Sequence, residues 1–160
     1  MEVSIERARR EDLEAVRRLL RASFLPVEGL ADWVSTTLVA RRDGAVIGSA
    51  ALETYGDGVL LRSVAVDSAM RRQAVGRRLV EAAIDLSREL RAPAIYLLTT
   101  TAERYFPSFG FERIDRAEVP TGVQASVEFT SACPSSATVM RRSMNSQKPT
   151  PKTTASPTDV

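Results

Sequence analysis

The chain has 160 residues, of which 44% are hydrophobic and 26% charged, and its formal net charge is +2. These values fit one globular domain with a sizeable core. Histidine is absent and Cys133 is the sole cysteine, which excludes an internal disulfide, a Cys/His zinc site and a histidine-dependent catalytic triad. The sequence shows no membrane span, no secretory signal and no basic stripe with interleaved aromatics. We therefore expect a cytoplasmic protein without a membrane or nucleic-acid partner.

Apolar periodicity predicts the elements of the first half of the chain. Residues 12–22 place apolar side chains at helical spacing with arginines opposite, which is typical of an amphipathic helix. Asp43-Gly44 separates two strand-like segments and indicates a hairpin turn. The expected elements are a strand at 3–8, helices at 12–22 and 30–34, and strands at 37–42, 45–54 and 59–66.

The second half alternates helices and strands in the same way. The almost wholly apolar segment 94–99 predicts a strand that is covered on both faces. The expected elements are a helix at 76–90, a strand at 94–99, helices at 102–108 and 120–129, and a strand at 137–142. Ser, Thr, Lys and Pro then dominate residues 143–160, which predicts a disordered tail behind a domain that spans residues 1–142.

One segment carries most of the functional information. The residues from Leu61 to Asp67 are typical of a buried strand, and the basic, small-residue segment from Arg71 to Arg77 opens the next helix. A helix start exposes unpaired backbone N–H groups and carries a partial positive charge. Small residues let a ligand approach the backbone, and arginines bind phosphate oxygens. The segment therefore predicts a pyrophosphate site.

The order of elements and the loop from Arg71 to Gly76 resemble the GNAT superfamily of acetyl-coenzyme A-dependent N-acetyltransferases. The family loop usually reads Arg/Gln-x-x-Gly-x-Gly/Ala, and here Ala74 stands at the first glycine position and Gly76 at the second. The loop lies about 30 residues before the motif from Tyr105 to Phe111. The resemblance implies an α/β (α+β) fold: a mixed, mostly antiparallel twisted sheet of about 6–7 strands, helices on both faces, and a wedge between the fourth and fifth strands.

The resemblance also implies where acetyl-CoA, the co-substrate, would bind, and it implies no metal. The pantetheine arm would pair with the fourth strand, and the pyrophosphate would lie on the amides of the loop. The implied cofactor contacts are Val64, Ala65, Val66, Arg71, Arg72, Gln73, Ala74, Val75, Gly76, Arg77 and Phe106. Family members are often homodimers, although no exposed stripe in this sequence requires one.

Within the superfamily, the segment from Tyr96 to Glu103 and the following Phe-Gly-Phe resemble the N-acetylglutamate synthase type of domain. The pattern that includes Val127-Glu128-Phe129 is most similar to N-acetyltransferases found with arsenic-resistance genes. This similarity implies a small, glutamate-like amine as acceptor, of the arsinothricin or phosphinothricin type. Two other functions stay open. One is a CoA-binding regulator without turnover, which the departures at Ala74 and Phe106 favour, and the other is a protein N-acetyltransferase.

Two residues are candidates for acid–base chemistry. Many family members place a tyrosine four residues before the glycine of the Gly-Phe pair, where it protonates the leaving thiolate. Here Phe106 holds that position and Tyr105 precedes it, so Tyr105 is either this acid, turned by about 100° on a helix, or a packing residue. Many members also carry a glutamate early in the fourth strand. Glu53, on the preceding strand, is the nearest replacement, either as a base acting through water or as a solvated strand-end carboxylate.

Further polar residues are candidates for substrate binding. Arg62 interrupts an apolar strand and would bind a carboxylate-like group of the acceptor, or else it points outward into solvent. Thr100, with its neighbours Thr99 and Thr101, would offer hydroxyls to either ligand, or else the threonines cap a strand end. Cys133 is a poor candidate for carrying an acetyl group, because the chain has no histidine to act as its base.

Overall fold

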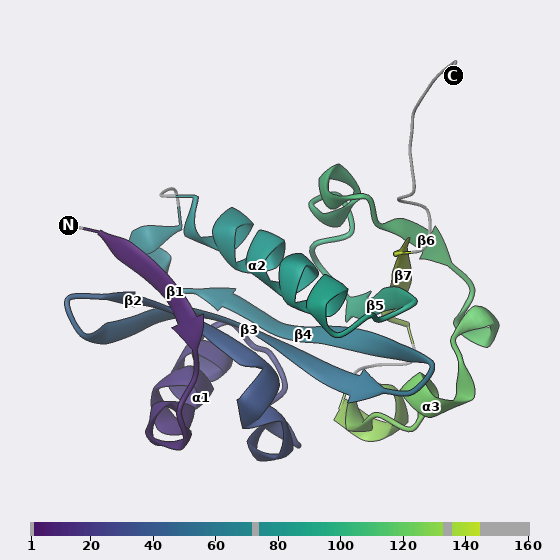
Figure 1. Ribbon diagram of the computed structural model, residues 1–160, viewed down its shortest axis with the longest axis horizontal. Helices are drawn as coiled ribbons and strands as arrows, with labels where there is room; N and C mark the ends of the chain where they lie inside the picture. Colours follow the sequence, from purple (N-terminus) through teal and green to yellow (C-terminus); the bar gives the residue numbers. More distant parts are fainter. Residues whose placement is uncertain (1, 72–73, 133–135, 145–160) are drawn as a thin grey trace.

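The computed structural model describes residues 2–71, 74–132 and 136–144. Figure 1 shows its main elements. They are β1 (Val3–Arg7), α1 (Leu13–Ala22), β2 (Thr37–Arg42), β3 (Ala45–Tyr55), β4 (Gly58–Val66), α2 (Val75–Glu89), β5 (Ala94–Thr99), β6 (Glu112–Ile114), α3 (Thr121–Gln124) and β7 (Thr138–Ser143). The connections include the 3-10 turns η2 (Leu30–Thr36) and η4 (Phe106–Phe109) and the π turn η6 (Glu128–Ala132).

The described strands form one seven-stranded sheet in the order β1-β2-β3-β4-β5-β7-β6. Neighbouring strands are antiparallel, except for β4 and β5, which run parallel. This arrangement confirms the predicted fold class. The parallel pairing is short: Val59 lies opposite Ile95 and Leu60 opposite Tyr96, and no other described residue of β4 pairs with β5. The two strands therefore diverge beyond Leu60, which produces the predicted wedge.

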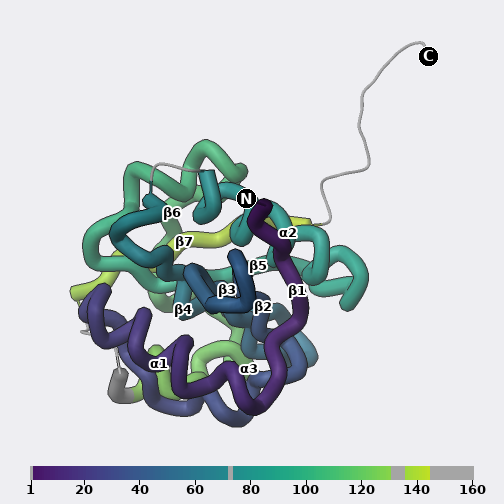
Figure 2. Tube along the Cα trace, turned by 90° about the vertical axis from the view of Figure 1, so that its left-hand side faces the viewer, coloured from purple at the N-terminus to yellow at the C-terminus, as the bar shows by residue number. Residues whose placement is uncertain are grey.

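Helices cover both faces of the sheet, α2 on one face and α1 with η2 on the other (Figures 1 and 2). The helical face predicted for α1 is confirmed, because Leu13, Val16, Leu19 and Leu20 are all buried. α2 likewise packs Leu79 and Val80, both fully buried, against the sheet. Burying a side chain of this size contributes about 1.5–3 kcal/mol. Within the described residues, no helix is long and apolar enough to cross a bilayer.

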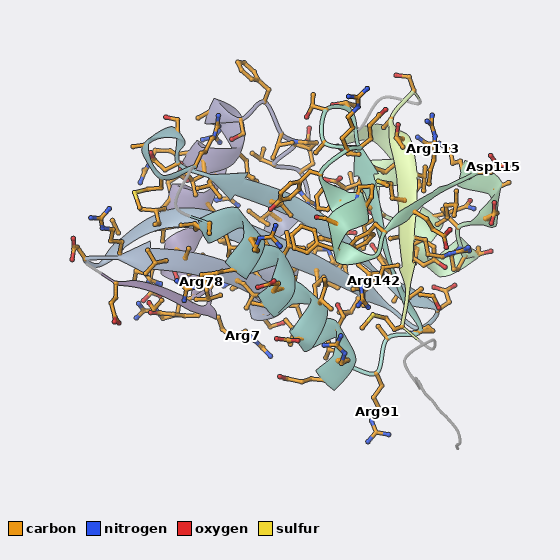
Figure 3. All side chains as sticks on the ribbon, turned by 90° about the horizontal axis from the view of Figure 1, so that it is seen from above. Arg7, Arg78, Arg91, Arg113, Asp115 and Arg142 are labelled. Atoms are coloured by element: carbon orange, nitrogen blue, oxygen red, sulfur yellow. The ribbon has the colours of Figure 1, made fainter. Side chains whose placement is uncertain are left out.

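Arginines tie these layers together at their margins. Arg78 on α2 donates from Nη1 to the carbonyl oxygen of Val3 on β1 at 2.9 Å, and Arg142 on β7 donates from Nε to the carbonyl oxygen of Phe109 at 2.8 Å (Figure 3). On the opposite face, Arg41 of β2 contacts the buried Asp12 at the start of α1, with Nη2 and Oδ2 2.9 Å apart. These contacts connect α2 to β1, α1 to β2, and β7 to η4.

A β-bulge at Ser63 realigns β4 where the wedge opens. The register passes from Ala51 opposite Arg62 to Ser49 opposite Ala65, so β4 has one more residue than β3 in this interval. Ser63 has a φ of +60°. Strict alternation would place positions 61 and 64 on opposite faces, yet Leu61 and Val64 both pack on the α2 side. The bulge thus shifts the alternation of β4 by one residue. Arg62, before the bulge, lies on the face away from α2, and Val64, after it, returns to the α2 side.

The second half departs from the predicted elements. The expected helix at 120–129 is only α3 followed by η6, because Ser126 Oγ accepts the backbone N–H of Glu128 at 3.0 Å and competes with helical bonding. The helix expected at 102–108 is reduced to η4. β6 was not predicted, since three residues are too short to show a period. Met144 is 5% exposed in the α2-side core, so the domain extends past residue 142. The remainder of the predicted tail lies outside the described residues.

Candidate active site

A cavity of about 1170 Å³ opens between β4 and β5, where the two strands diverge. This volume exceeds the roughly 300–1,000 Å³ that is usual for a small-ligand site. The cavity is lined by residues 21–28 at the end of α1 and after it, residues 61–66 of β4, residues 97–102 of β5 and its following loop, and Arg71, Ala74, Gly76, Arg77, Tyr105, Phe106, Glu128 and Ala137. Strand backbone therefore forms two walls, and the start of α2 closes one end.

The start of α2 offers an anion site at that end. Its first helical hydrogen bond runs from Arg78 N to Ala74 O at 3.2 Å, so the N–H groups of Val75, Gly76 and Arg77 precede any intrahelical acceptor. Among the described residues, no side chain caps this helix. Ala74 adopts the left-handed region at φ +60°, in place of the family's first glycine. Arg71 and Arg77 add positive charge beside these amides, as the predicted phosphate site requires.

The predicted cofactor contacts divide into three groups. The structure brings together around the cavity Val64, Ala65, Val66, Arg71, Ala74, Gly76, Arg77 and Phe106. Val75 is 1% exposed with its side chain in the core, so only its backbone can serve a ligand. Arg72 and Gln73 lie outside the described residues.

Tyr105 stands at the junction of the cavity and the start of α2. A Cβ atom built on Gly76 would lie 3.4 Å from the Tyr105 hydroxyl. The ring also packs edge-on against Phe106 and Phe109, with centroids 5.3 and 5.2 Å apart. Partial burial raises the pKa of the Tyr105 hydroxyl, an effect that Arg77 opposes and Glu81 reinforces. The hydroxyl therefore keeps its proton at neutral pH, as a general acid must.

Arg62 forms the centre of a buried ion cluster. Its side chain is fully buried, which rules out the alternative of an outward, solvated arginine. Nη1 lies 2.8 Å from Glu53 Oε2, and Nε lies 3.4 Å from Glu128 Oε2. Nε also donates to Ser63 Oγ at 3.0 Å, at the bulge. Arg62 lines the cavity, but its guanidinium already has two carboxylate partners.

Glu53 belongs to this cluster but does not line the cavity. It is fully buried and is not among the lining residues, so the alternative of a solvated strand-end carboxylate is wrong. Its Oε1 accepts the Tyr55 hydroxyl. Burial is the main reason why the pKa of the Tyr55 hydroxyl is raised, and the hydrogen bond to Glu53 adds to the effect. The role of Glu53 as a base acting through water stays a prediction.

The remaining candidates lie at the cavity rim or beyond the described residues. Thr100 is exposed and lines the cavity. Thr99 has the capping role that the sequence allowed, because its Oγ1 accepts the backbone N–H of Ala102 at 2.9 Å. Cys133 falls outside the described residues. Within the described ranges, no group of three or more His, Cys, Asp or Glu side chains could hold a metal.

Glu128 is the lining residue that sequence reasoning missed. It belongs to a motif already noted for its similarity to known domains, but it was assigned to a helix that does not form. Glu128 is 5% exposed and is the first residue of the π turn η6. The only signal in the sequence was an acidic residue between two apolar ones, Val127 and Phe129. Such a pattern does not reveal a partner on β4.

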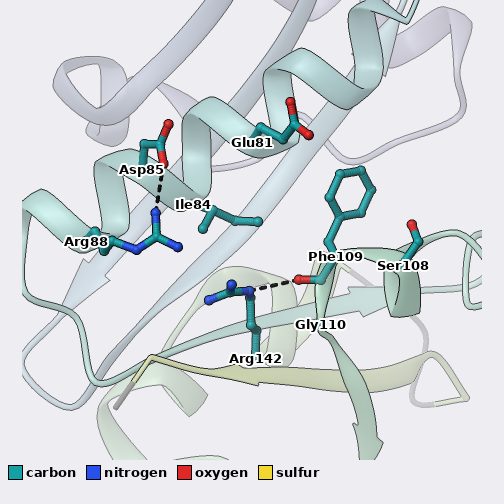
Figure 4. Close-up of a pocket in the computed structure, with 8 residues that line it drawn as sticks. All are labelled: Glu81, Ile84, Asp85, Arg88, Ser108, Phe109, Gly110 and Arg142. Atoms are coloured by element: carbon teal, nitrogen blue, oxygen red, sulfur yellow. Dashed lines mark hydrogen bonds and ion pairs between the residues drawn. The ribbon is translucent and has the colours of Figure 1, made fainter. Parts of the chain in front are cut away.

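A second, more open depression of about 420 Å³ lies between the later turns of α2 and the Phe109–Gly110 segment (Figure 4). Three of its charged groups have partners: Arg88 contacts Asp85 at 2.8 Å, and Arg142 binds the carbonyl oxygen of Phe109. Burial, followed by the charge of Arg88, lowers the pKa of Arg142. The depression lacks the free strand and helix-start backbone that distinguish the larger cavity.

Known proteins share this architecture. The profile of the acetyltransferase (GNAT) domain family matches residues 33–113, about half of the chain. N-acetylglutamate synthase from Neisseria gonorrhoeae, solved with coenzyme A and N-acetyl-glutamate, has a TM-score of 0.77 at 22% identity over 90% of this chain. The match covers 35% of that protein, so this chain spans about a third of its length.

Two other solved structures are similar over nearly their whole length. Rv2747 from Mycobacterium tuberculosis, in complex with CoA, has a TM-score of 0.75 at 24% identity, covering 88% of this chain and 99% of that one. The PaiA N-acetyltransferase from Thermoplasma acidophilum, in complex with coenzyme A, has a TM-score of 0.67 at 15% identity, covering 89% and 99%. At these identities the likeness concerns the fold. No curated protein matches the chain.

Proposed function

We propose that this chain, which belongs to the GNAT acetyltransferase family, is an acyltransferase that transfers an acetyl group from acetyl-CoA to the amine of a small molecule. The observation that carries this proposal is the continuity between the wedge and the start of α2. One cavity joins the part of β4 that does not pair with β5, the amides at Val75 to Arg77, and the side chains of Arg71 and Arg77. Such a site suits a long ligand with a peptide-like arm and a diphosphate.

The similar structures support this choice of co-substrate. Three of them were solved with coenzyme A in place. In this chain the pantetheine arm would lie along Val64 to Val66, with the pyrophosphate at Gly76. Phe106, which is 6% exposed, would supply an apolar wall. This placement puts the thioester deep in the wedge, near the bulge at Ser63.

The reaction needs a neutral amine and a stabilised oxyanion. An α-amino group has a pKa of about 8, so removing one proton is a modest task. The amine attacks the acetyl carbonyl, and a backbone N–H of β4 near Val64 or Ala65 would stabilise the oxyanion. Holding both substrates in line supplies a large part of the acceleration. The C–S bond then breaks, and Tyr105 would protonate the departing thiolate.

A glutamate-like amine is the acceptor that we propose, of the kind represented by phosphinothricin or arsinothricin. The N-acetylglutamate synthase of similar fold was solved with N-acetyl-glutamate, and the sequence resembles acetyltransferases found with arsenic-resistance genes. Arg62 and Thr100 remain the proposed contacts for the acid end of such a molecule. Because Arg62 already faces Glu53 and Glu128, an acceptor carboxylate would have to share the guanidinium with them.

Thiol release tests the proposal directly. The full chain is incubated with acetyl-CoA and a panel of amino acids, phosphinothricin, aminoglycosides and a lysine peptide, and free thiol is followed by a colorimetric reagent. We expect turnover with at least one small amine, and micromolar acetyl-CoA affinity by calorimetry. Affinity without thiol release on any amine would indicate a CoA-binding regulator, and turnover on the peptide alone would indicate a protein acetyltransferase.

A further inference from the structure

We propose that Glu128 binds the acceptor's ammonium group and removes its proton, with Arg62 as the residue that positions it. The inference rests on the acetyltransferase function proposed above and assigns the acceptor end of the same cavity. Glu128 lines that cavity, whereas Glu53, the base expected from the sequence, does not. The acid–base role therefore falls to the carboxylate that a substrate can reach.

The position of Glu128 in the fold supports this assignment. The residue comes from the layer opposite α2, and its carboxylate contacts Arg62 Nε at 3.4 Å. The same Nε contacts Ser63 Oγ at 3.0 Å, which locates the carboxylate beside the bulge of β4. Val64 and Ala65 follow directly, and they form the wall on which the acetyl carbonyl would be held. An amine between Glu128 and this wall would have both its base and its electrophile at hand.

The charges of the cluster favour a cationic acceptor. Glu53 and Glu128 both face the guanidinium of Arg62 in a buried site. Of these two carboxylates only Glu128 lines the cavity, and it would attract a substrate ammonium group by charge. An acceptor with only a carboxylate would instead meet two like charges around Arg62.

The other acidic residue that lines the cavity explains less. Glu28 also lines the cavity, but it is exposed in the loop after α1, at the rim. Solvent there screens its charge and weakens any hold on an amine. Glu128 is buried and is held from one side by a fixed arginine. A base that is pre-oriented in this way loses little freedom when substrate binds.

Atoms and protons balance in the proposed acetyl transfer. The ammonium group gives one proton to the Glu128 carboxylate, and the nitrogen lone pair forms the N–C bond at the acetyl carbonyl. As the tetrahedral intermediate collapses, the C–S bond breaks and the nitrogen loses its second proton, while the thiolate gains one. The products are an N-acetyl amide, free coenzyme A and the proton on Glu128, which passes to water. No oxidant, reductant or metal takes part in this balance.

The test compares Glu128→Gln with two matched variants. Glu128→Gln keeps the size of the side chain and removes its charge, and we expect kcat/KM for the amine to fall by about 10²-fold or more. Acetyl-CoA affinity should stay within about twofold, because the diphosphate site is separate. Glu118→Gln removes an ion-paired carboxylate outside the cavity, 3.6 Å from Arg141, and should keep wild-type rates. Glu128→Asp keeps the charge and should restore part of the activity.

The pH profile separates a base from a merely structural residue. Without its base, Glu128→Gln can use only amine that is already neutral in solution. Its rate should therefore rise with pH up to the pKa of the amine, which is about 8 for an α-amino group. The difference from wild type should therefore narrow at alkaline pH. A structural defect would instead lower the rate by a similar factor at every pH.

Several outcomes would overturn the inference. If wild type turns over and Glu128→Gln matches it, or if Glu28→Gln is the variant that loses activity, Glu128 is not the base while the proposed function stands. A Glu128→Gln enzyme that becomes faster with carboxylate acceptors would mean that Glu128 obstructs Arg62. If Glu128→Gln does not fold, Glu128→Asp becomes the test, and a rate that falls by the same factor at every pH in that variant would reject the role. Absence of turnover in wild type on every amine would overturn the proposed function and this inference together.

Discussion

The hydroxyl of Tyr105 lies beside Gly76, 3.4 Å from where a Cβ of residue 76 would stand. Gly76 belongs to the first turn of α2, and Tyr105 precedes η4, 29 positions later in the sequence. The contact joins the candidate acid to the candidate diphosphate site at one end of the cavity. A cofactor held by the amides of α2 would therefore pass this hydroxyl close to its diphosphate, and the proposed role of Tyr105 as the acid requires the thiolate to come within reach of the same hydroxyl.

Gly76→Ala should separate stability from cofactor affinity. The added methyl group would meet only the Tyr105 hydroxyl at 3.4 Å and Val66 Cγ2 at 3.6 Å, which is ordinary contact. Alanine favours a helix over glycine by about 0.5–1 kcal/mol, so the free energy of unfolding should rise. The methyl group would stand where phosphate approaches, so the Kd for acetyl-CoA should rise about tenfold, a cost of about 1.4 kcal/mol.

Calorimetry and urea denaturation check this pair of effects. Gly56→Ala is the control, because a Cβ at residue 56 would meet nothing within 4 Å and the residue lies in the turn between β3 and β4. Unchanged affinity in Gly76→Ala would argue against a diphosphate at this turn.

Tyr105→Phe should lower kcat by about 10- to 100-fold, because the leaving thiolate loses its proton donor. The pKa of this hydroxyl is raised, chiefly by burial, so the donor stays protonated up to at least its usual value of about 10. The wild-type rate should accordingly show no alkaline loss from Tyr105 below that pH. Tyr96→Phe, in the core on β5 and 5% exposed, should keep its rate. Steady-state kinetics with full turnover in Tyr105→Phe would leave this tyrosine a packing role only.

Ala74→Gly should stabilise the protein by about 0.5–1 kcal/mol. The left-handed conformation at φ +60° costs an L-residue about 1–2 kcal/mol, and glycine would remove this cost. The greater freedom of glycine in the unfolded chain would offset about 0.4–1 kcal/mol of the gain. Ala82→Gly, within α2, should do the reverse and destabilise by about 1 kcal/mol. Urea midpoints measure both. A loss of stability in Ala74→Gly would contradict the conformation assigned to this loop.

Asp12→Asn should destabilise the protein by about 2 kcal/mol at neutral pH. Hydrogen bonds from Arg41, at 3.2 and 2.9 Å, are the main reason why the pKa of the Asp12 carboxyl is lowered, and burial opposes them. A lowered folded pKa stabilises the protein above the unfolded value of about 3.9 and stops doing so as pH falls through the folded value. The difference between wild type and variant should therefore close below about pH 4.

Thermal or urea unfolding as a function of pH measures this difference. Asp85→Asn removes an exposed pair with Arg88 and should change stability by less than about 1 kcal/mol at any pH. A gap for Asp12→Asn that persists unchanged at pH 3 would mean that charge is not its cause.

Local pattern was enough to predict much of this fold. The apolar spacing of α1 and α2 and the turn at Asp43-Gly44 are properties of neighbouring residues, and each was confirmed within a residue or two. The start of α2 behind a basic, small-residue segment was also predictable, because it needs only contiguous sequence, and its role as an anion site stays a prediction. The helix expected at 120–129 failed for a local reason as well, since the Ser126 side chain competes for backbone bonds.

The acceptor end of the site could not be predicted in this way. Whether Arg62 is solvated or paired depends on Glu128, 66 residues away in the sequence, and on the bulge at Ser63. Neither apolar periodicity nor a short sequence motif indicates a contact between segments so far apart. The bulge was not predictable either, because the residue in the left-handed conformation is Ser63 and not a glycine.

The sequence by itself thus determined the sheet-forming segments, the two long helices and the loop that suits a diphosphate, because each depends on residues that are adjacent or one turn apart. Only the tertiary structure decided which carboxylate reaches the cavity. Glu53 and Glu128 have the same chemistry, yet packing on opposite sides of Arg62 buries the first and gives the second a place on the cavity wall.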